Sequence, residues 1–133
     1  MSAAYECNVA LARSFMDAFN RRDLDDFFAV LSEDIELHTP RGIRRGRLEA
    51  EEWFTKPLDH LDLHVEEGRL LVTENEVVWF GHLAFTWKES GELAERVEGA
   101  AVWGVEDGLI RSWEPFDTAA EALRAIGVLS ALD

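Results

Sequence analysis

Residues 77–116 read VVWFGHLAFTWKESGELAERVEGAAVWGVEDGLIRSWEPF, and this stretch predicts three consecutive antiparallel strands. Its first segment, Val77–Lys88, is apolar at both odd and even positions, which is typical of a central strand covered on both faces. The turn sequences ESGE and DG divide the stretch, and an Asp-Gly pair between apolar runs is a strong signal for a two-residue hairpin. We therefore expect two further strands, Leu93–Glu106 and Leu109–Phe116, folded back beside the first.

The two turns also predict which side chains share a face of the sheet. A regular Asp-Gly turn pairs Val102 with Trp113 and Ala100 with Pro115. Counting residues outward from the ESGE turn pairs the first strand with the second in the same way. One face is then expected to carry Trp79, Gly81, Leu83, Phe85, Trp87, Arg96, Glu98, Ala100, Val102, Arg111, Trp113 and Pro115. The other face would carry His82, Gly99, Ala101, Trp103, Ser112 and Glu114. A bulge in any strand would reverse part of this assignment.

The composition restricts the class of protein. A chain of 133 residues suits one domain, residues 1–133, and its five Trp and eight Phe can fill a core. The net charge of -14 argues against nucleic acid or an anionic membrane as a partner. A single cysteine, Cys7, permits no intrachain disulfide and fits a reducing compartment. With no apolar run of membrane-spanning length and no signal-peptide pattern, we expect a cytoplasmic protein.

The flanking segments predict helices around the sheet. Apolar residues spaced by three and four predict one helix over Ala3–Asn20 and a second over Leu24–Leu31, the latter capped by Asp23. The other expected elements are a short strand at 35–38, a helix at 48–55, a half-buried strand at 61–65 and a last helix at 119–126. This order predicts an α+β fold with helices packed on one side of an antiparallel sheet.

Two groups of polar residues stand outside this pattern. Arg41, Arg44, Arg45 and Arg47 could guide an anionic substrate to a pocket mouth, or they could simply pair with the glutamates of the next helix. His60 and His64 lie among aspartates and glutamates on a wet face, without the convergent ligands of a metal site. We therefore expect neither a metal nor a cofactor.

The order of elements and three sequence runs resemble the nuclear-transport-factor-2-like superfamily, and within it the SnoaL-like polyketide cyclases and ketosteroid isomerases. The runs are FMDAFNRRDLDDFFAVLSEDIELHTPRG at 15–42, DGLIRSWEPFD at 107–117 and EALRAIG at 121–127. The resemblance implies a cone-shaped, curved antiparallel sheet packed on three N-terminal helices plus a short C-terminal helix. It also implies a homodimer and a cavity for an apolar small molecule between sheet and helices.

The resemblance further implies where catalytic groups would stand. The tyrosine, the aspartate base and the protonated aspartate of a ketosteroid isomerase would fall at Phe15, Thr39 and Ala100, and none of these side chains can replace them. The aspartate of a related epoxide hydrolase would fall at Pro115, and the partners of that aspartate are missing as well. The resemblance therefore implies the fold of these enzymes, but the catalytic residues of both the isomerase and the hydrolase are missing from this sequence.

Two polar pairs remain as candidates for chemistry. Arg96 and Glu98 are expected on the inward face among tryptophans, where they could move a proton beside a bound carbonyl or form an ordinary ion pair. His82 and Glu114 are expected on the opposite face of the sheet. They would line the cavity only if the side chains of these strands point to the opposite face from the one predicted. The residues expected to line the pocket are Phe15, Thr39, Trp79, Leu83, Ala100, Val102, Trp113 and Pro115.

Two functions fit these observations. The first is a small-molecule enzyme that uses acid-base chemistry to isomerise, cyclise or hydrate an apolar cyclic substrate. The second is a non-catalytic ligand-binding or dimerisation module of the same fold, which the missing catalytic residues favour.

Overall fold

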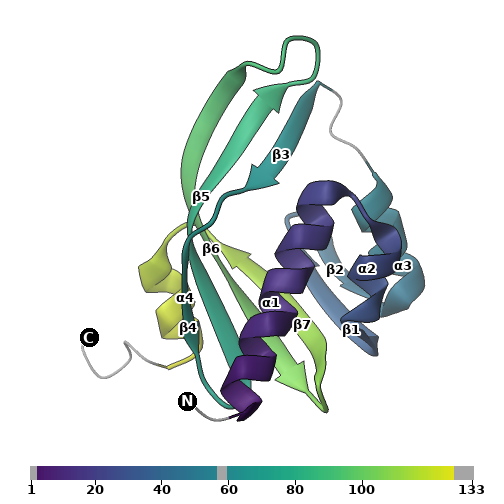
Figure 1. The fold of residues 1–133 in the computed structure, drawn as a ribbon, viewed down its shortest axis with the longest axis vertical. Coiled ribbons are helices and arrows are strands. Elements are labelled where there is room, and N and C mark those ends of the chain that lie inside the picture. The colour runs from purple at the N-terminus through teal and green to yellow at the C-terminus, as the bar shows by residue number, and fades with distance from the viewer. Residues whose placement is uncertain (1–2, 57–59, 128–133) are drawn as a thin grey trace.

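Three helices lie on one side of a strongly curled sheet and a fourth lies on the other (Figure 1). The structure, a computed structural model, describes residues 3–56 and 60–127. The helices are α1 (Ala3–Arg21), α2 (Leu24–Ala29), α3 (Gly46–Thr55) and α4 (Ala119–Ala125). The predicted α+β fold, with three N-terminal helices and a short C-terminal one around a curved sheet, is confirmed. The expectation that all helices pack on one side is wrong, because α4 covers the convex face.

The sheet is mixed rather than purely antiparallel. Its strands are β1 (Leu31–Thr39), β2 (Gly42–Arg45), β3 (Leu61–Val65), β4 (Arg69–Val72), β5 (Glu76–Trp87), β6 (Leu93–Glu106) and β7 (Leu109–Phe116). They run in the order β2-β1-β7-β6-β5-β3, and β4 also pairs with β5. β1 lies parallel to β7, which joins the first strand of the chain to the last. The bounds of β6 and β7 match the prediction, whereas β2 and β4 were not predicted as strands.

The Asp107-Gly108 turn forms as predicted, with φ values of 54° and 75°, and it places Glu106 opposite Leu109. These left-handed backbone angles are the ones that a two-residue hairpin of this type requires. Beyond the turn, however, the predicted register fails. Trp113 pairs with Trp103 rather than with Val102.

Two bulges cause this difference. In β7 the pairing shifts between Ile110 and Ser112, so that Arg111 is an extra residue. In β6 it shifts beside Ala94, because Thr86 pairs with Leu93 while the preceding residue of β5 pairs with Glu95. An extra residue in one strand changes which side chains face which side of the sheet beyond it. The predicted facing is therefore right for β5 and for the end of β7, and wrong for β6.

The corrected facing explains the core. Trp103, with only 1% of its surface exposed, belongs to the main core with Ala101. Val102 and Ala100 lie on the opposite face, in a second apolar cluster under Ala122 of α4. The concave face therefore carries the Trp103 indole together with Ala101, and the convex face carries the residues that contact α4.

Side-chain amides fasten α1 to the sheet. Asn20 donates from Nδ2 to the carbonyl oxygen of Val65 and accepts from the Val65 amide nitrogen, both at 2.8 Å. Near the start of the helix, Asn8 donates to the carbonyl oxygens of Thr73 and Glu74 at 3.1 and 2.9 Å. Each amide satisfies backbone groups that no neighbouring strand reaches, so α1 is held at both of its ends.

Within residues 3–56 and 60–127, no helix is both long and apolar enough to cross a membrane.

Candidate functional site

A cavity of about 770 Å³ lies between the concave face of the sheet and the helices. Its walls come from α1, α3, β1, β2, β3, β5, β6 and β7, so no single element forms it. The larger apolar side chains of the lining include Phe15, Met16, Phe19, Ile43, Trp53, Leu63, Val65, Trp79, Leu83, Phe85, Val97, Trp103 and Trp113. The size and the aromatic walls are those of a site for a drug-sized apolar molecule.

The aromatic rings of the wall are packed against one another. The Trp113 ring centroid lies 5.2 Å from that of Trp53 and 6.0 Å from that of Phe15. Phe15 also meets Trp103 edge to face at 5.6 Å. Trp53 and Trp113 are each half-buried, so they offer ring surface to the hollow while their neighbours hold them in place.

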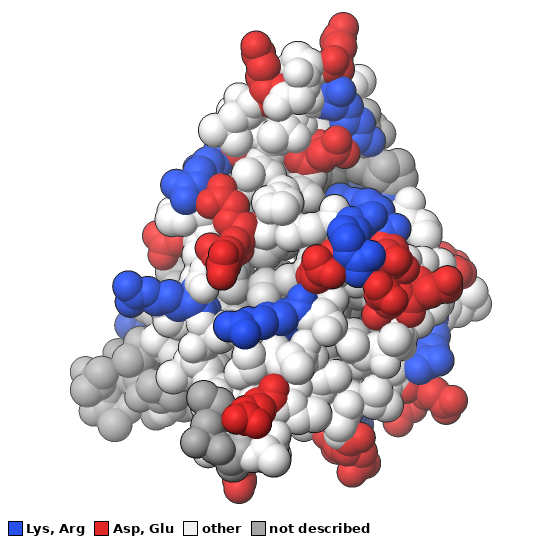
Figure 2. Space-filling model, in the orientation of Figure 1, with Lys and Arg blue, Asp and Glu red and all other residues white. Residues whose placement is uncertain are grey.

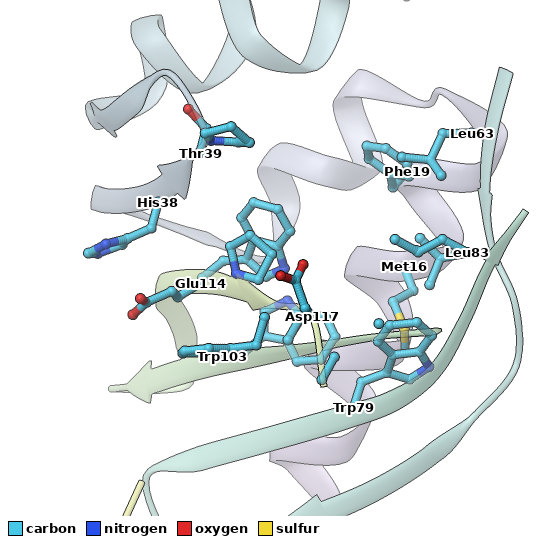
Figure 3. Close-up of a pocket in the computed structure, with 18 of the residues that line it drawn as sticks. Met16, Phe19, His38, Thr39, Leu63, Trp79, Leu83, Trp103, Glu114 and Asp117 are labelled. Atoms are coloured by element: carbon cyan, nitrogen blue, oxygen red, sulfur yellow. The ribbon is translucent and has the colours of Figure 1, made fainter. Parts of the chain in front are cut away.

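The polar residues gather at one end of the cavity (Figure 3). In this view Met16, Phe19, Leu63, Leu83 and Trp79 lie on one side, and His38, Thr39 and Glu114 lie on the other. Asp117 lies between them, with its carboxylate among the lining side chains, whereas His38 and Glu114 extend away from the hollow. The cavity therefore has an apolar end and a polar end.

Two of these polar groups are already engaged. The Thr39 hydroxyl donates to the carbonyl oxygen of Gly42 at 2.7 Å and accepts from the amide nitrogen of Arg41 at 3.3 Å. His38 Nε2 lies 3.6 Å from a carboxylate oxygen of Glu36. Asp117 has no hydrogen bond or ion pair within the described part of the chain. Asp117 is exposed to solvent and is part of the cavity lining.

The structure brings most of the predicted site residues to the cavity and leaves three of them away from it. The lining includes Phe15, Thr39, Trp79, Leu83, Glu98, Ala100, Trp113, Glu114 and Pro115. Val102, Arg96 and His82 do not line it. Val102 packs under α4, because the register of β6 is shifted by one residue.

The predicted pairing of Arg96 with Glu98 is wrong. Arg96 forms a two-pronged ion pair with Glu66 instead, with both shortest N–O distances at 2.8 Å. The guanidinium holds the pKa of the Glu66 carboxyl below its usual value, so Glu66 stays ionised. Glu98 is exposed and lies beside His82 across β5 and β6, on the same face as Ala100. Its side chain therefore belongs to the convex face of the sheet, although the residue is part of the cavity lining.

Asp117 is the site residue that the sequence reading missed. It was expected, with Thr118, as a cap for the last helix, and in the structure Thr118 alone caps α4 by accepting from the Glu121 amide at 3.2 Å. Asp117 follows the end of β7 two positions after Pro115, so the alternation of the strand, if continued by one residue, puts it on the side of Trp113 and Pro115. That alternation was the available signal.

The described residues contain no group of three or more His, Cys, Asp or Glu side chains that could hold a metal ion.

Comparison with known proteins identifies the family. The model of the SnoaL-like domain matches residues 12–113. The chain belongs to the SnoaL-like domain family. The match extends from α1 to β7 and so includes most elements that form the cavity. The sequence matches no curated protein.

Solved structures with the same fold carry the names of two enzyme classes. A proposed polyketide cyclase from Xanthomonas campestris pv. campestris is 18% identical with a TM-score of 0.76, over 94% of this chain and 100% of that one. A proposed ketosteroid isomerase from Kribbella flavida is 26% identical with a TM-score of 0.68, over 84% and 78% of the two chains. A Delta 5-3-ketosteroid isomerase from Mycobacterium sp. is 18% identical with a TM-score of 0.68, over 83% and 92%.

Proposed function

We propose that this SnoaL-like protein binds an apolar, ring-containing small molecule in its cavity. The observation that supports the proposal is the hollow of about 770 Å³, walled by aromatic and aliphatic side chains and polar at one end. Burying a ligand against such walls contributes about 25 cal/mol for each Å² of apolar surface removed from water. Ring systems are suited to these walls, because Trp79, Trp113 and Leu83 all line the hollow.

A cavity-filling substitution tests the binding. Leu83→Phe enlarges a side chain that lines the hollow, and Leu71→Phe makes the same change on β4 outside it, where Leu71 is 37% exposed. We expect tryptophan fluorescence of the parent protein to report binding of compact alicyclic alcohols or ketones. Leu83→Phe should weaken that binding about tenfold or more, because the added ring occupies ligand volume, and Leu71→Phe should leave it unchanged. Equal affinities of the two variants would contradict binding in this cavity.

Proton transfer by Asp117 is a second candidate function. The carboxylate lies among the lining side chains, and the described residues give it no partner. A carboxylate in that position could take a proton from carbon next to a bound carbonyl, which is the kind of step that isomerases and cyclases use. The residues that the resemblance would place in this role, Thr39 and Ala100, cannot perform it.

A substrate panel separates catalysis from binding. Ketosteroid, polyketide and epoxide compounds would be incubated with the parent protein, Asp117→Asn and Glu98→Gln. If Asp117 is the base, Asp117→Asn should lower the rate constant of turnover at least about a hundredfold, a typical loss for a general base. Glu98→Gln should change it little, because the side chain of Glu98 is on the convex face of the sheet. Binding without turnover of any compound would instead favour the non-catalytic module.

A further inference from the structure

The wall of the cavity differs from the outer surface of the molecule. On the face shown in Figure 2, basic side chains lie beside acidic ones in several places. The cavity lining, as far as the structure describes it, holds no lysine or arginine and consists mostly of aromatic and aliphatic side chains. Apolar walls discriminate by shape, because a gap loses dispersion contacts and an overlap forces side chains out of their preferred rotamers. The features that set the shape of the hollow therefore decide which ligands fit.

Two glycines lie opposite each other near the middle of the concave face. Gly81 of β5 pairs directly with Gly99 of β6. In the alternation of β5, Gly81 lies between Trp79 and Leu83, so it shares with them the face that lines the cavity. Glycine weakens the interior of a strand, and it often marks a place where another group approaches the backbone closely. The pair therefore indicates a close contact on this face.

The group that approaches is the indole of Trp79. A methyl group added at Gly81 would lie 3.1 Å from Cζ2 and 3.3 Å from Cε2 of the ring, and one added at Gly99 would lie 3.8 Å from Cζ3. A third glycine, Gly68 in the bend between β3 and β4, borders the ring nitrogen, because a methyl group added there would lie 2.6 Å from Nε1. The ring therefore lies low on the sheet, against glycine backbone at three points.

This placement keeps Trp79 and Leu83 out of the hollow. Trp79 lines the cavity, yet only 2% of its surface is exposed. Leu83 lies beside Gly99, where an added methyl group would be 3.3 Å from Cδ1 and 3.4 Å from Cγ of Leu83. Contacts this short are tighter than most contacts of a Cβ atom, so the neighbouring side chain has to shift. Because the paired strands lie beneath them, Trp79 and Leu83, which Figure 3 shows on the same side of the cavity, would shift mainly into the hollow.

We propose that Gly81 and Gly99 set the size of ligand that the cavity accepts, by letting Trp79 and Leu83 lie low on the sheet. The inference rests on the proposed binding function and assigns its size specificity to two positions that carry no side chain. It predicts ligands with thick ring bodies, such as bridged or branched rings, because a single ring does not need the depth that the two glycines provide. A side chain at either position would raise the floor of the hollow.

Gly68 has a different role and does not report on ligand size. A methyl group at Gly68 would also lie 2.5 Å from the carbonyl oxygen of Phe80, and a backbone oxygen within the sheet has no room to move aside. We expect Gly68→Ala to destabilise the fold itself. The atoms nearest to a methyl group at Gly99 all belong to side chains, so Gly99→Ala should leave the protein folded, as circular dichroism would verify. Gly99→Ala carries the test if Gly81→Ala does not fold.

Two alcohols of different thickness test the proposal. Cyclohexanol and adamantanol carry the same hydroxyl group on a single ring and on a bridged cage, and neither absorbs where tryptophan is excited. Their dissociation constants would be measured by tryptophan fluorescence with the parent protein, Gly81→Ala, Gly99→Ala and Ala84→Val. The control, Ala84→Val, adds methyl groups to β5 at a residue that does not line the cavity.

The expected result is a loss that depends on ligand size. Each glycine substitution should weaken the binding of adamantanol about tenfold and that of cyclohexanol by less than about twofold, because only the thicker body needs the space that the methyl group takes. Ala84→Val should leave both affinities unchanged.

Replacing the neighbour shows whether each glycine acts through it. In a Trp79→Phe background the smaller ring leaves room, so Gly81→Ala should weaken adamantanol binding by no more than about twofold. Leu83→Ala should relieve the effect of Gly99→Ala in the same way. If the effects persist in full, the glycines do not act by holding Trp79 and Leu83 out of the hollow, and the proposal is wrong.

The size specificity and the cavity function fail on different results. If the glycine variants lose affinity for both alcohols equally, or for neither, Gly81 and Gly99 do not set the ligand size. Adamantanol binding that Leu83→Phe blocks would still support the cavity function in that case. If the parent protein binds neither alcohol, the cavity function and the size specificity are contradicted together.

Discussion

Replacing Asn20 with alanine tests whether the amide that fastens α1 to the sheet stabilises the cone. The side chain makes two hydrogen bonds with the backbone of Val65, both at 2.8 Å, and Val65 lines the cavity. Removing the amide leaves one N–H and one C=O without their partner. Because each unsatisfied backbone group costs about 1–3 kcal/mol when buried and less when water reaches it, we expect a loss of about 2–3 kcal/mol in the free energy of unfolding.

The measurement is urea and thermal unfolding followed by tryptophan fluorescence and circular dichroism. A loss of that size should lower the melting temperature by roughly 10 °C in a domain of this length. Asn75→Ala is the matched control, because Asn75 is exposed and its side chain makes no hydrogen bond within the described residues. If the two variants unfold at the same temperature, the Asn20 amide does not contribute to stability and the reasoning is refuted.

Two further predictions concern the sheet. Trp103→Ala should lower the free energy of unfolding by about 3–5 kcal/mol, as removal of a fully buried ring does. Trp87→Ala should cost far less, because Trp87 is 47% exposed. Denaturant unfolding measures both losses, and similar losses for the two variants would contradict the facing of β6 described above. Arg96→Gln should lower the melting temperature at neutral pH only. The guanidinium depresses the pKa of Glu66 in the folded state, so its stabilisation is present above the carboxyl's ordinary value of 4.5 and is lost as the pH falls below it. A difference in melting temperature that persists in acid would show that Arg96 acts through packing instead.

The sequence predicted the elements well because the signals for them are local. Asp23 caps α2 by accepting from the Asp26 amide at 3.0 Å, as its position before an apolar repeat indicated. The Asp107-Gly108 turn likewise fixes its own conformation, since few residues other than glycine and aspartate tolerate those backbone angles. Such features depend on neighbours in the chain and can be recognised without the rest of the fold.

The register and the polar end of the cavity were not predictable in the same way. The bulge at Arg111 is favoured by tertiary packing, because it lets both Ile110 and Trp113 face the core although they are three residues apart. The parallel contact of β1 with β7 joins segments from opposite ends of the chain, and no local pattern indicates it. Asp117 was missed because an aspartate before a helix is usually a cap, and only its alternation with Trp113 suggested otherwise.

The extra residue at Arg111 has a consequence for how this architecture can vary. Because Arg111 is opposite the same partner as its neighbour, a chain one residue shorter at this point would keep Ile110 and Trp113 on the same side and would lose mainly the local bend of the strand. Shortening the strand by this one residue would thus change mainly the curvature of β7 and leave the identity of the cavity walls intact. A single deletion at Arg111 would therefore reshape the concave wall before any side chain that lines the cavity is replaced.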